Sequence, residues 1–291
     1  METMVCDKVT KRYGKKEVVK NLNITLEKGK IYGLIGRNGA GKTTLLSMMA
    51  AQNPVSAGNV TLNGQNIWEN QNALSHICFA REINLGTNQN TLASMRVRDY
   101  LKTASWFYPA WDKELAEKLV GKFELDAKKR LGKLSKGMLS AVTIIVALAS
   151  KADFTFMDEP VAGLDVVMRE YFYRVLLEEY MNSGRTFVVS THIIEEASDV
   201  FEEVLILKEG ELLLKENTTE LLERAYRVSG LAETVEEAVK DLTCYHEEKS
   251  GRAKSVTVLL DAGESLPEGY DVSIQPLTLQ NVFVALCGME E

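Results

Sequence analysis

The sequence has 291 residues, of which 45% are hydrophobic and 26% are charged. This composition is typical of folded globular proteins and excludes the disordered, collagen-like and coiled-coil classes, and the length is sufficient for about two domains. The 41 acidic residues exceed the 34 basic ones, giving a net charge of -7, which argues against a long nucleic-acid-binding surface.

Two features of the sequence predict a cytoplasmic chain. The longest apolar stretch, Ala141 to Ala149, is much shorter than the ~18 to 20 residues of a membrane-spanning helix. The first residues, Met1 to Cys6, lack the basic stretch and apolar core of a secretion signal. The four cysteines lie far apart without a C-x-x-C pair, so we expect reduced, buried thiols rather than a zinc site or disulfides.

The pattern of apolar residues predicts an α/β fold. Short apolar runs at residues 31–35, 154–157 and 186–190 have the character of buried parallel strands. From about Leu85 to Ala149 the pattern becomes helical, with Leu115, Leu119 and Val120 on one helix face. After about Leu214 the sequence is strongly charged, and it then predicts a helix near 235–242, a turn at 249–253 and a strand near 255–260.

These patterns divide the chain into two expected parts. We expect a main domain over residues 1–214, with a helical subdomain at about 85–149. Residues 215–291 are expected to form a small C-terminal α+β domain.

The strongest motif follows the first of these predicted strands and opens a predicted helix. It fits G-x-x-x-x-G-K-[ST], the pattern of a phosphate-binding loop. In such a loop the backbone N–H groups converge on phosphate oxygens, the lysine reaches the β- and γ-phosphates, and the hydroxyl after it binds Mg²⁺. The residues of this loop and of the helix start are Gly36, Arg37, Asn38, Gly39, Ala40, Gly41, Lys42, Thr43 and Thr44.

A phosphate loop of this kind requires a carboxylate that positions the metal. The strand at 154–157 is followed by Asp158 and Glu159, which can hold Mg²⁺ and act as general base toward water, respectively. His192 follows the strand at 186–190, where its imidazole can bond the γ-phosphate and orient that water.

The ordered set of motifs over residues 1 to about 215 resembles the ATP-binding subunit of an ATP-binding cassette (ABC) transporter. Leu134-Ser-Lys-Gly-Met138 resembles the signature Leu-Ser-Gly-Gly-Gln, and Ala162-Gly-Leu-Asp165 resembles the D-loop. The resemblance implies a P-loop nucleoside triphosphatase fold with ATP and Mg²⁺ as cofactors. It also implies a head-to-tail pair of nucleotide domains, in which each ATP lies between one phosphate loop and the opposite signature.

The same resemblance assigns nucleotide contacts to further residues. Tyr13 stands where an adenine-stacking aromatic is expected, although it equally suits a core or edge aromatic. Ser135 and the backbone of Gly137 face the γ-phosphate of the opposite site. Asp165 belongs to the D-loop, although it also suits a helix cap.

Three residues depart from the family pattern. Lys136 replaces a glycine and Met138 a glutamine, so the signature carries a charge that either strengthens phosphate binding or points to solvent. Glu82 stands 40 positions beyond Lys42, where the family has the glutamine of the Q-loop, and Gln89 is the alternative. A glutamate there would be a strong ligand for Mg²⁺, although it also suits an exposed loop acid.

The resemblance implies an ATPase that drives a separate transmembrane permease together with a second ATPase subunit, identical or different. Phe107-Tyr-Pro-Ala-Trp-Asp112 and the long C-terminal extension resemble the branch of drug, peptide and lipid exporters, which includes bacitracin- and daunorubicin-type pumps. We expect no nucleic-acid partner and a cytoplasmic position on the inner face of the membrane through the permease. Alternatives are a non-transport ABC ATPase acting on nucleic acid or ribosomes, and a small-molecule P-loop kinase.

An aromatic cluster in the helical segment has two interpretations. Trp106, Phe107, Tyr108 and Trp111 either contribute to the surface that docks on the permease or fill the small core of this segment.

Overall fold

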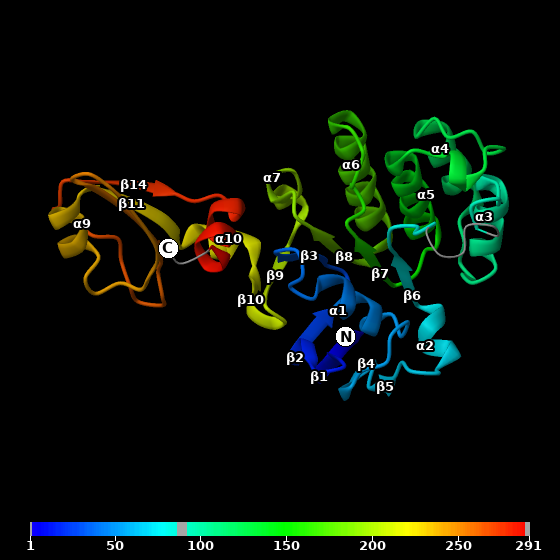
Figure 1. The fold of residues 1–291 in the computed structure, drawn as a ribbon, viewed down its shortest axis with the longest axis horizontal. Coiled ribbons are helices and arrows are strands. Elements are labelled where there is room, and N and C mark those ends of the chain that lie inside the picture. Colours follow the sequence, from blue (N-terminus) through cyan, green and yellow to red (C-terminus); the bar gives the residue numbers. More distant parts are fainter. Residues whose placement is uncertain (1, 86–91, 289–291) are drawn as a thin grey trace.

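The computed structural model describes residues 2–85 and 92–288, and within these ranges the strands form three sheets (Figure 1). The central sheet has the order β10-β9-β3-β8-β7-β6, in which every neighbouring pair except β10 with β9 is parallel. Strands β3, β7 and β8 are almost entirely buried, which confirms the predicted interior strands. The strands of this sheet are β3 (Ile31–Gly36), β6 (Ile77–Ala80), β7 (Phe154–Asp158), β8 (Thr186–Thr191), β9 (Glu203–Lys208) and β10 (Glu211–Asn217).

A second, antiparallel sheet packs on one side of the central sheet with helix α1 (Lys42–Met49) in the same apolar core. Its strand order is β2-β1-β4-β5. The bounds of these strands are β1 (Thr3–Tyr13), β2 (Lys16–Glu27), β4 (Ala57–Leu62) and β5 (Gln65–Asn66). The first sheet and this one therefore enclose the helix that begins at the phosphate loop.

Helices gather on the other side of the central sheet, where α3, α4 and α5 lie together (Figure 1). The described part of residues 85–149 contains α3, α4 and α5 and the short 3-10 helix η1, so its predicted helical character is confirmed, and Leu115 and Leu119 of α4 are buried while Val120 is partly buried. The limits of a helical subdomain stay a prediction. The helices up to residue 200 are α2 (Gln71–Ser75), α3 (Val97–Ser105), α4 (Lys113–Lys122), η1 (Leu131–Lys133), α5 (Lys136–Ala149), α6 (Val166–Ser183), α7 (Ile194–Ala197) and η2 (Ser198–Val200).

The C-terminal part forms the third sheet, antiparallel and in the order β12-β13-β11-β14. Its helix α9 packs on one face of this sheet around Val228, Val235 and Val256. The elements are α8 (Thr218–Glu223), β11 (Ala225–Leu231), α9 (Ala232–Ala238), β12 (Cys244–Ser250), β13 (Ala253–Leu259), β14 (Val272–Pro276) and α10 (Leu279–Cys287). The expected turn between β12 and β13 is confirmed.

The expected boundary after residue 214 falls inside β10, which still pairs with β9. Helix α10 then returns to the main core, where Leu279 and Val282 belong to the same apolar cluster as Ile31 and Ile35 of β3. The division into two domains therefore stays a proposal, because the chain crosses the expected boundary as a paired strand. All four cysteines are free thiols; Cys244 is partly exposed and the other three are buried.

A buried arginine joins the signature-bearing helix to the central sheet. Arg185, only 3% exposed, donates hydrogen bonds to the carbonyl oxygens of Ala147, Leu148 and Ala152 at 2.8 to 2.9 Å and to Oγ1 of Thr155 at 2.8 Å. Burial lowers its pKa to about 10. The guanidinium thus satisfies carbonyls that the end of α5 leaves without helical partners.

We predict that Arg185→Met lowers the free energy of unfolding by at least about 3 kcal/mol, because several buried carbonyls lose their donor at once. Urea denaturation followed by circular dichroism measures this change. The exposed Arg98 is the control, and Arg98→Met should stay within about 0.5 kcal/mol of the wild type. Equal stabilities of the two variants would contradict a structural role for Arg185.

Candidate functional site

The phosphate loop joins β3 to α1 in a conformation that requires its glycines. Gly39 and Gly41 have φ of 84° and 105°, a region that side chains disfavour. A Cβ on Gly36 would lie 2.7 Å from the carbonyl oxygen of Leu207 in the neighbouring strand. The buried ammonium group of Lys42 donates a 2.6 Å hydrogen bond to the carbonyl oxygen of Gly36, so the loop encloses its own cation.

The ends of two strands, β7 and β8, meet this loop at the carboxyl edge of the sheet. Thr43 donates through Oγ1 to Oδ2 of Asp158 at 2.7 Å, and Ser190 donates through Oγ to Oδ1 of the same carboxylate at 2.6 Å. The backbone N–H of Glu159 donates to Ser190 Oγ at 3.0 Å. Ser190 therefore orients both acids. Sequence reasoning missed this residue, although it directly precedes the Thr-His pair at the end of β8.

Glu159 has an unusual backbone and two polar neighbours. Its φ of 49° places it in the left-handed region, where a residue other than glycine costs about 1–3 kcal/mol. Its Oε2 lies 2.6 Å from Nδ1 of His192 and its Oε1 lies 3.7 Å from Nζ of Lys42. Because an ionised carboxylate only accepts, Nδ1 carries the proton of this bond. The sequence predicts that His192 bonds a phosphate; in this structure its ring bonds Glu159.

The three expected metal ligands line one cavity of about 890 Å³. Thr43, Glu82 and Asp158 offer a hydroxyl and two carboxylates there, which are the hard oxygen donors that Mg²⁺ prefers. The donor set therefore fits Mg²⁺ beside the phosphate loop. Gln89, the alternative to Glu82, lies outside the described residues.

Tyr13 lies at the surface with its ring held on two sides. Its Oη accepts a 2.6 Å hydrogen bond from Nδ2 of Asn53, and the ammonium group of Lys11 lies 5.2 Å from the ring centroid. The ring is exposed, so it is available for stacking, and the alternative of a core aromatic does not fit this position.

The remaining predicted residues, Ser135, Gly137 and Asp165, lie at the starts of two helices, α5 and α6. Ser135 caps α5 by accepting from the N–H of Met138 at 3.2 Å, and Asp165 caps α6 by accepting from the N–H of Met168 at 2.9 Å. A Cβ on Gly137 would collide with the carbonyl oxygen of Gly163. Within the part of the chain that the structure describes, none of these predicted residues is among those lining the cavity of Thr43 and Asp158.

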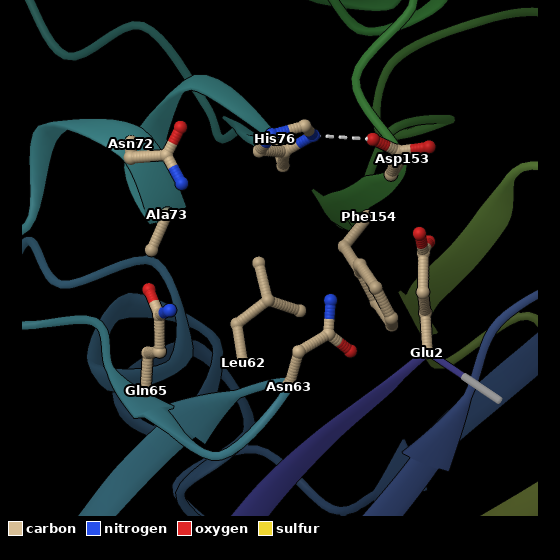
Figure 2. Close-up of a pocket in the computed structure, with 9 residues that line it drawn as sticks. All are labelled: Glu2, Leu62, Asn63, Gln65, Asn72, Ala73, His76, Asp153 and Phe154. Carbon is tan, nitrogen blue, oxygen red and sulfur yellow. Dashed lines mark hydrogen bonds and ion pairs between the residues drawn. The ribbon is translucent and has the colours of Figure 1, made fainter.

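A smaller pocket, of about 170 Å³, lies near the start of β7 rather than its end (Figure 2). Nδ1 of His76 lies 2.6 Å from Asp153, whose pKa is lowered because hydrogen bonds from Lys28 and His76 outweigh the opposing effect of burial. Glu2 contributes a second carboxylate to the lining. Two carboxylates repel a polyphosphate, so this pocket does not suit the triphosphate group that the sequence assigns to the loop.

Comparisons with known proteins identify relatives of this chain. The sequence profile described as "ABC transporter" matches residues 19–162. The chain is 29% identical to the bacitracin transport ATP-binding protein BcrA of Bacillus licheniformis, over 96% of this chain and 95% of BcrA. It is also 32% identical to human ATP-binding cassette sub-family A member 13, over 70% of this chain and only 4% of that protein.

The fold has counterparts among solved structures. The dimeric structure of MJ0796, a bacterial ABC transporter cassette, matches 74% of this chain and 98% of its own, with a TM-score of 0.63 and 23% identity. This likeness confirms the predicted α/β fold of a P-loop nucleoside triphosphatase.

Proposed function

The chain carries the ATP-binding domain of the ABC transporter family and is an ABC ATPase, and we propose that it dimerises on MgATP and drives substrate export by a separate membrane permease. The resemblance and the ATPase assignment expected from the sequence are confirmed. The observation that carries the proposal is the hydrogen-bonded group at the carboxyl edge of the sheet, where Thr43, Asp158 and Glu159 adjoin the phosphate loop.

In this proposal the loop and the start of α1 bind the phosphates. The N–H groups at the helix N-terminus point toward an anion, and Lys42 exchanges its bond with Gly36 for the β- and γ-phosphates. Thr43, Asp158 and Glu82 would hold Mg²⁺, which neutralises phosphate charge when it is bound. Tyr13 stacks on the adenine.

Glu159 is the proposed general base. It accepts a proton from water as the water oxygen bonds to the γ-phosphorus, and the bond from that phosphorus to the β–γ bridging oxygen breaks, which gives ADP and phosphate. His192 orients Glu159 through the bond that the structure contains. The bond from the Glu159 N–H to Ser190 and the left-handed backbone fix where this carboxylate projects.

We propose that each site is completed by a second ATPase subunit. Ser135, Gly137 and the N-terminus of α5 suit the γ-phosphate of the opposite site, and Asp165 lies at the start of α6 where the two copies would meet. Two observations support this proposal. Ser135, Gly137 and Asp165 are not among the described residues that line the cavity of Thr43 and Asp158, and one of the structural relatives is a dimeric cassette.

A groove between α2 and the helical segment suits the permease. Its volume is about 890 Å³, and Trp106 and Phe107, each 71% exposed, line it. Tyr108 also lines this groove, but its ring stacks on Trp111 with ring centroids 6.4 Å apart, and both of these rings pack against the core. The aromatic cluster therefore divides between the two interpretations: Trp106 and Phe107 suit docking, Trp111 packs on the core, and Tyr108 does both.

A membrane partner is part of the proposal because BcrA, which this chain matches over 95% of its length, is named a transport ATP-binding protein. In the described ranges, no helix is long and apolar enough to span a bilayer. We propose that the subunit is cytoplasmic and binds the inner face of the membrane through the permease. The net charge of -7 disfavours the alternative of an ABC ATPase acting on nucleic acid or ribosomes.

We predict that Glu159→Gln retains MgATP binding while hydrolysis falls at least ~10²-fold, the scale of a lost general base. An ATP-bound dimer should then accumulate, detected by size-exclusion chromatography. Glu195→Gln is the control, because this exposed acid stands three positions after His192 in the sequence, and its turnover should match the wild type. Near-normal hydrolysis by Glu159→Gln would assign the base elsewhere.

We also predict that Trp106→Ala with Phe107→Ala abolishes copurification with the cognate permease from gently solubilised membranes. The double variant should keep its fold and its MgATP affinity, because both rings are exposed. Met181→Ala, which truncates an exposed side chain on α6, is the control and should copurify normally. Normal complex assembly by the folded double variant would exclude these rings from the interface.

A further inference from the structure

An ion pair links the metal side of the site to the start of the signature helix. Nζ of Lys136, the first residue of α5, lies 3.3 Å from Oε1 of Glu82 in the loop after β6. The sequence left open whether Lys136 strengthens phosphate binding or points to solvent. The structure gives a third arrangement, in which its partner is an acid of the same chain.

These two residues are the charged departures from the family pattern described above. Lys136 stands in place of a glycine, and Glu82 in place of a glutamine. Their opposite charges meet in space although 54 positions separate them in the sequence (136 − 82). The pair therefore exists only because both positions differ from the pattern.

Packing fixes the base of the Lys136 side chain. A Cβ on Gly163 would lie 3.0 Å from Cγ of Lys136, so the lysine stem rests on this glycine. About one helical turn later, Ser140 anchors the same region by donating through Oγ to the carbonyl oxygen of Ala162 at 2.6 Å. The start of α5 is thus held against the segment that follows Asp158 and Glu159, and from there the lysine reaches Glu82.

The proposed function gives the Glu82 carboxylate a second partner. It lines the cavity that Thr43 and Asp158 share, where the proposed function assigns it to Mg²⁺. A divalent cation beside Asp158 and the ammonium group of Lys136 both attract this carboxylate. The lysine and glutamate side chains are 59% and 62% exposed, so their ion pair is weak enough to be exchanged.

We propose that Lys136 is a positioning residue that competes with Mg²⁺ for Glu82. In the nucleotide-free chain it holds the Glu82 carboxylate toward the signature. When MgATP binds, Glu82 turns to the metal and Lys136 is released at the end of α5 that faces a second subunit. Occupation of one site is thereby linked to the signature that serves the other, an inference that rests on the proposed function.

The test compares the Kd of adenylyl imidodiphosphate, a non-hydrolysable ATP analogue, in Mg²⁺ and in EDTA by isothermal titration calorimetry. Lys136→Met keeps the stem that packs on Gly163 and removes the charge. We expect it to tighten binding about twofold to fivefold in Mg²⁺, the factor that an exposed ion pair supplies, and to leave binding in EDTA unchanged.

Two further variants make the result specific. The tightening should disappear in a Glu82→Gln background, because the competing partner is then neutral. Lys133→Met removes the same charge from an exposed position in the short helix before the signature, and it should leave both constants unchanged.

The direction in which Lys136→Met changes the Kd of the analogue tests the proposal. If Lys136 only attracts phosphate, Lys136→Met weakens binding in Mg²⁺ and in EDTA alike, which overturns the proposal. Unchanged binding in Mg²⁺, or tightening that persists with Glu82→Gln, overturns it as well. If the wild type itself fails to bind the analogue in Mg²⁺, the proposed function fails, and that outcome is distinguishable from the others.

Discussion

The site depends on the register of neighbouring parallel strands. Because β7 and β8 pair Asp158 with Ser190, and β3 runs beside β8 into the phosphate loop, three strand ends reach the same edge of the sheet. The Asp158 carboxylate then accepts from both Thr43 and Ser190. A register shift of one residue would turn Asp158 to the other face of the sheet and separate the metal side of the site from the phosphate loop.

Local sequence patterns predict much of the fold and of the candidate site. The glycines and Lys42 form a contiguous motif, and the apolar run before Asp158 identifies a buried strand, so loop, strands and acids follow from short stretches of sequence. The order of the motifs then identified the family. Which of these residues act on the nucleotide stays a prediction, because their positions are consistent with the assigned roles without testing them.

The other features arise from contacts between distant parts of the chain, which no local pattern encodes. Ser190 acts through Asp158, 32 positions away, and Lys136 meets Glu82 only after the helical segment has folded back. Trp106 and Tyr108 are nearly adjacent, yet one is exposed and the other packs on the core. The return of α10 to the main core likewise depends on tertiary packing that composition alone does not indicate.

The central claim is that Lys42 of the phosphate loop binds the phosphates of MgATP. Calorimetric titration of MgATP into the Lys42→Ala variant tests it most directly. The account predicts loss of measurable binding, since the charge that neutralises the β- and γ-phosphates is gone. Lys254→Ala is the matched control, because it removes an equally buried lysine from β13, and it should bind as the wild type does. Unchanged MgATP affinity in a folded Lys42→Ala chain would contradict the account.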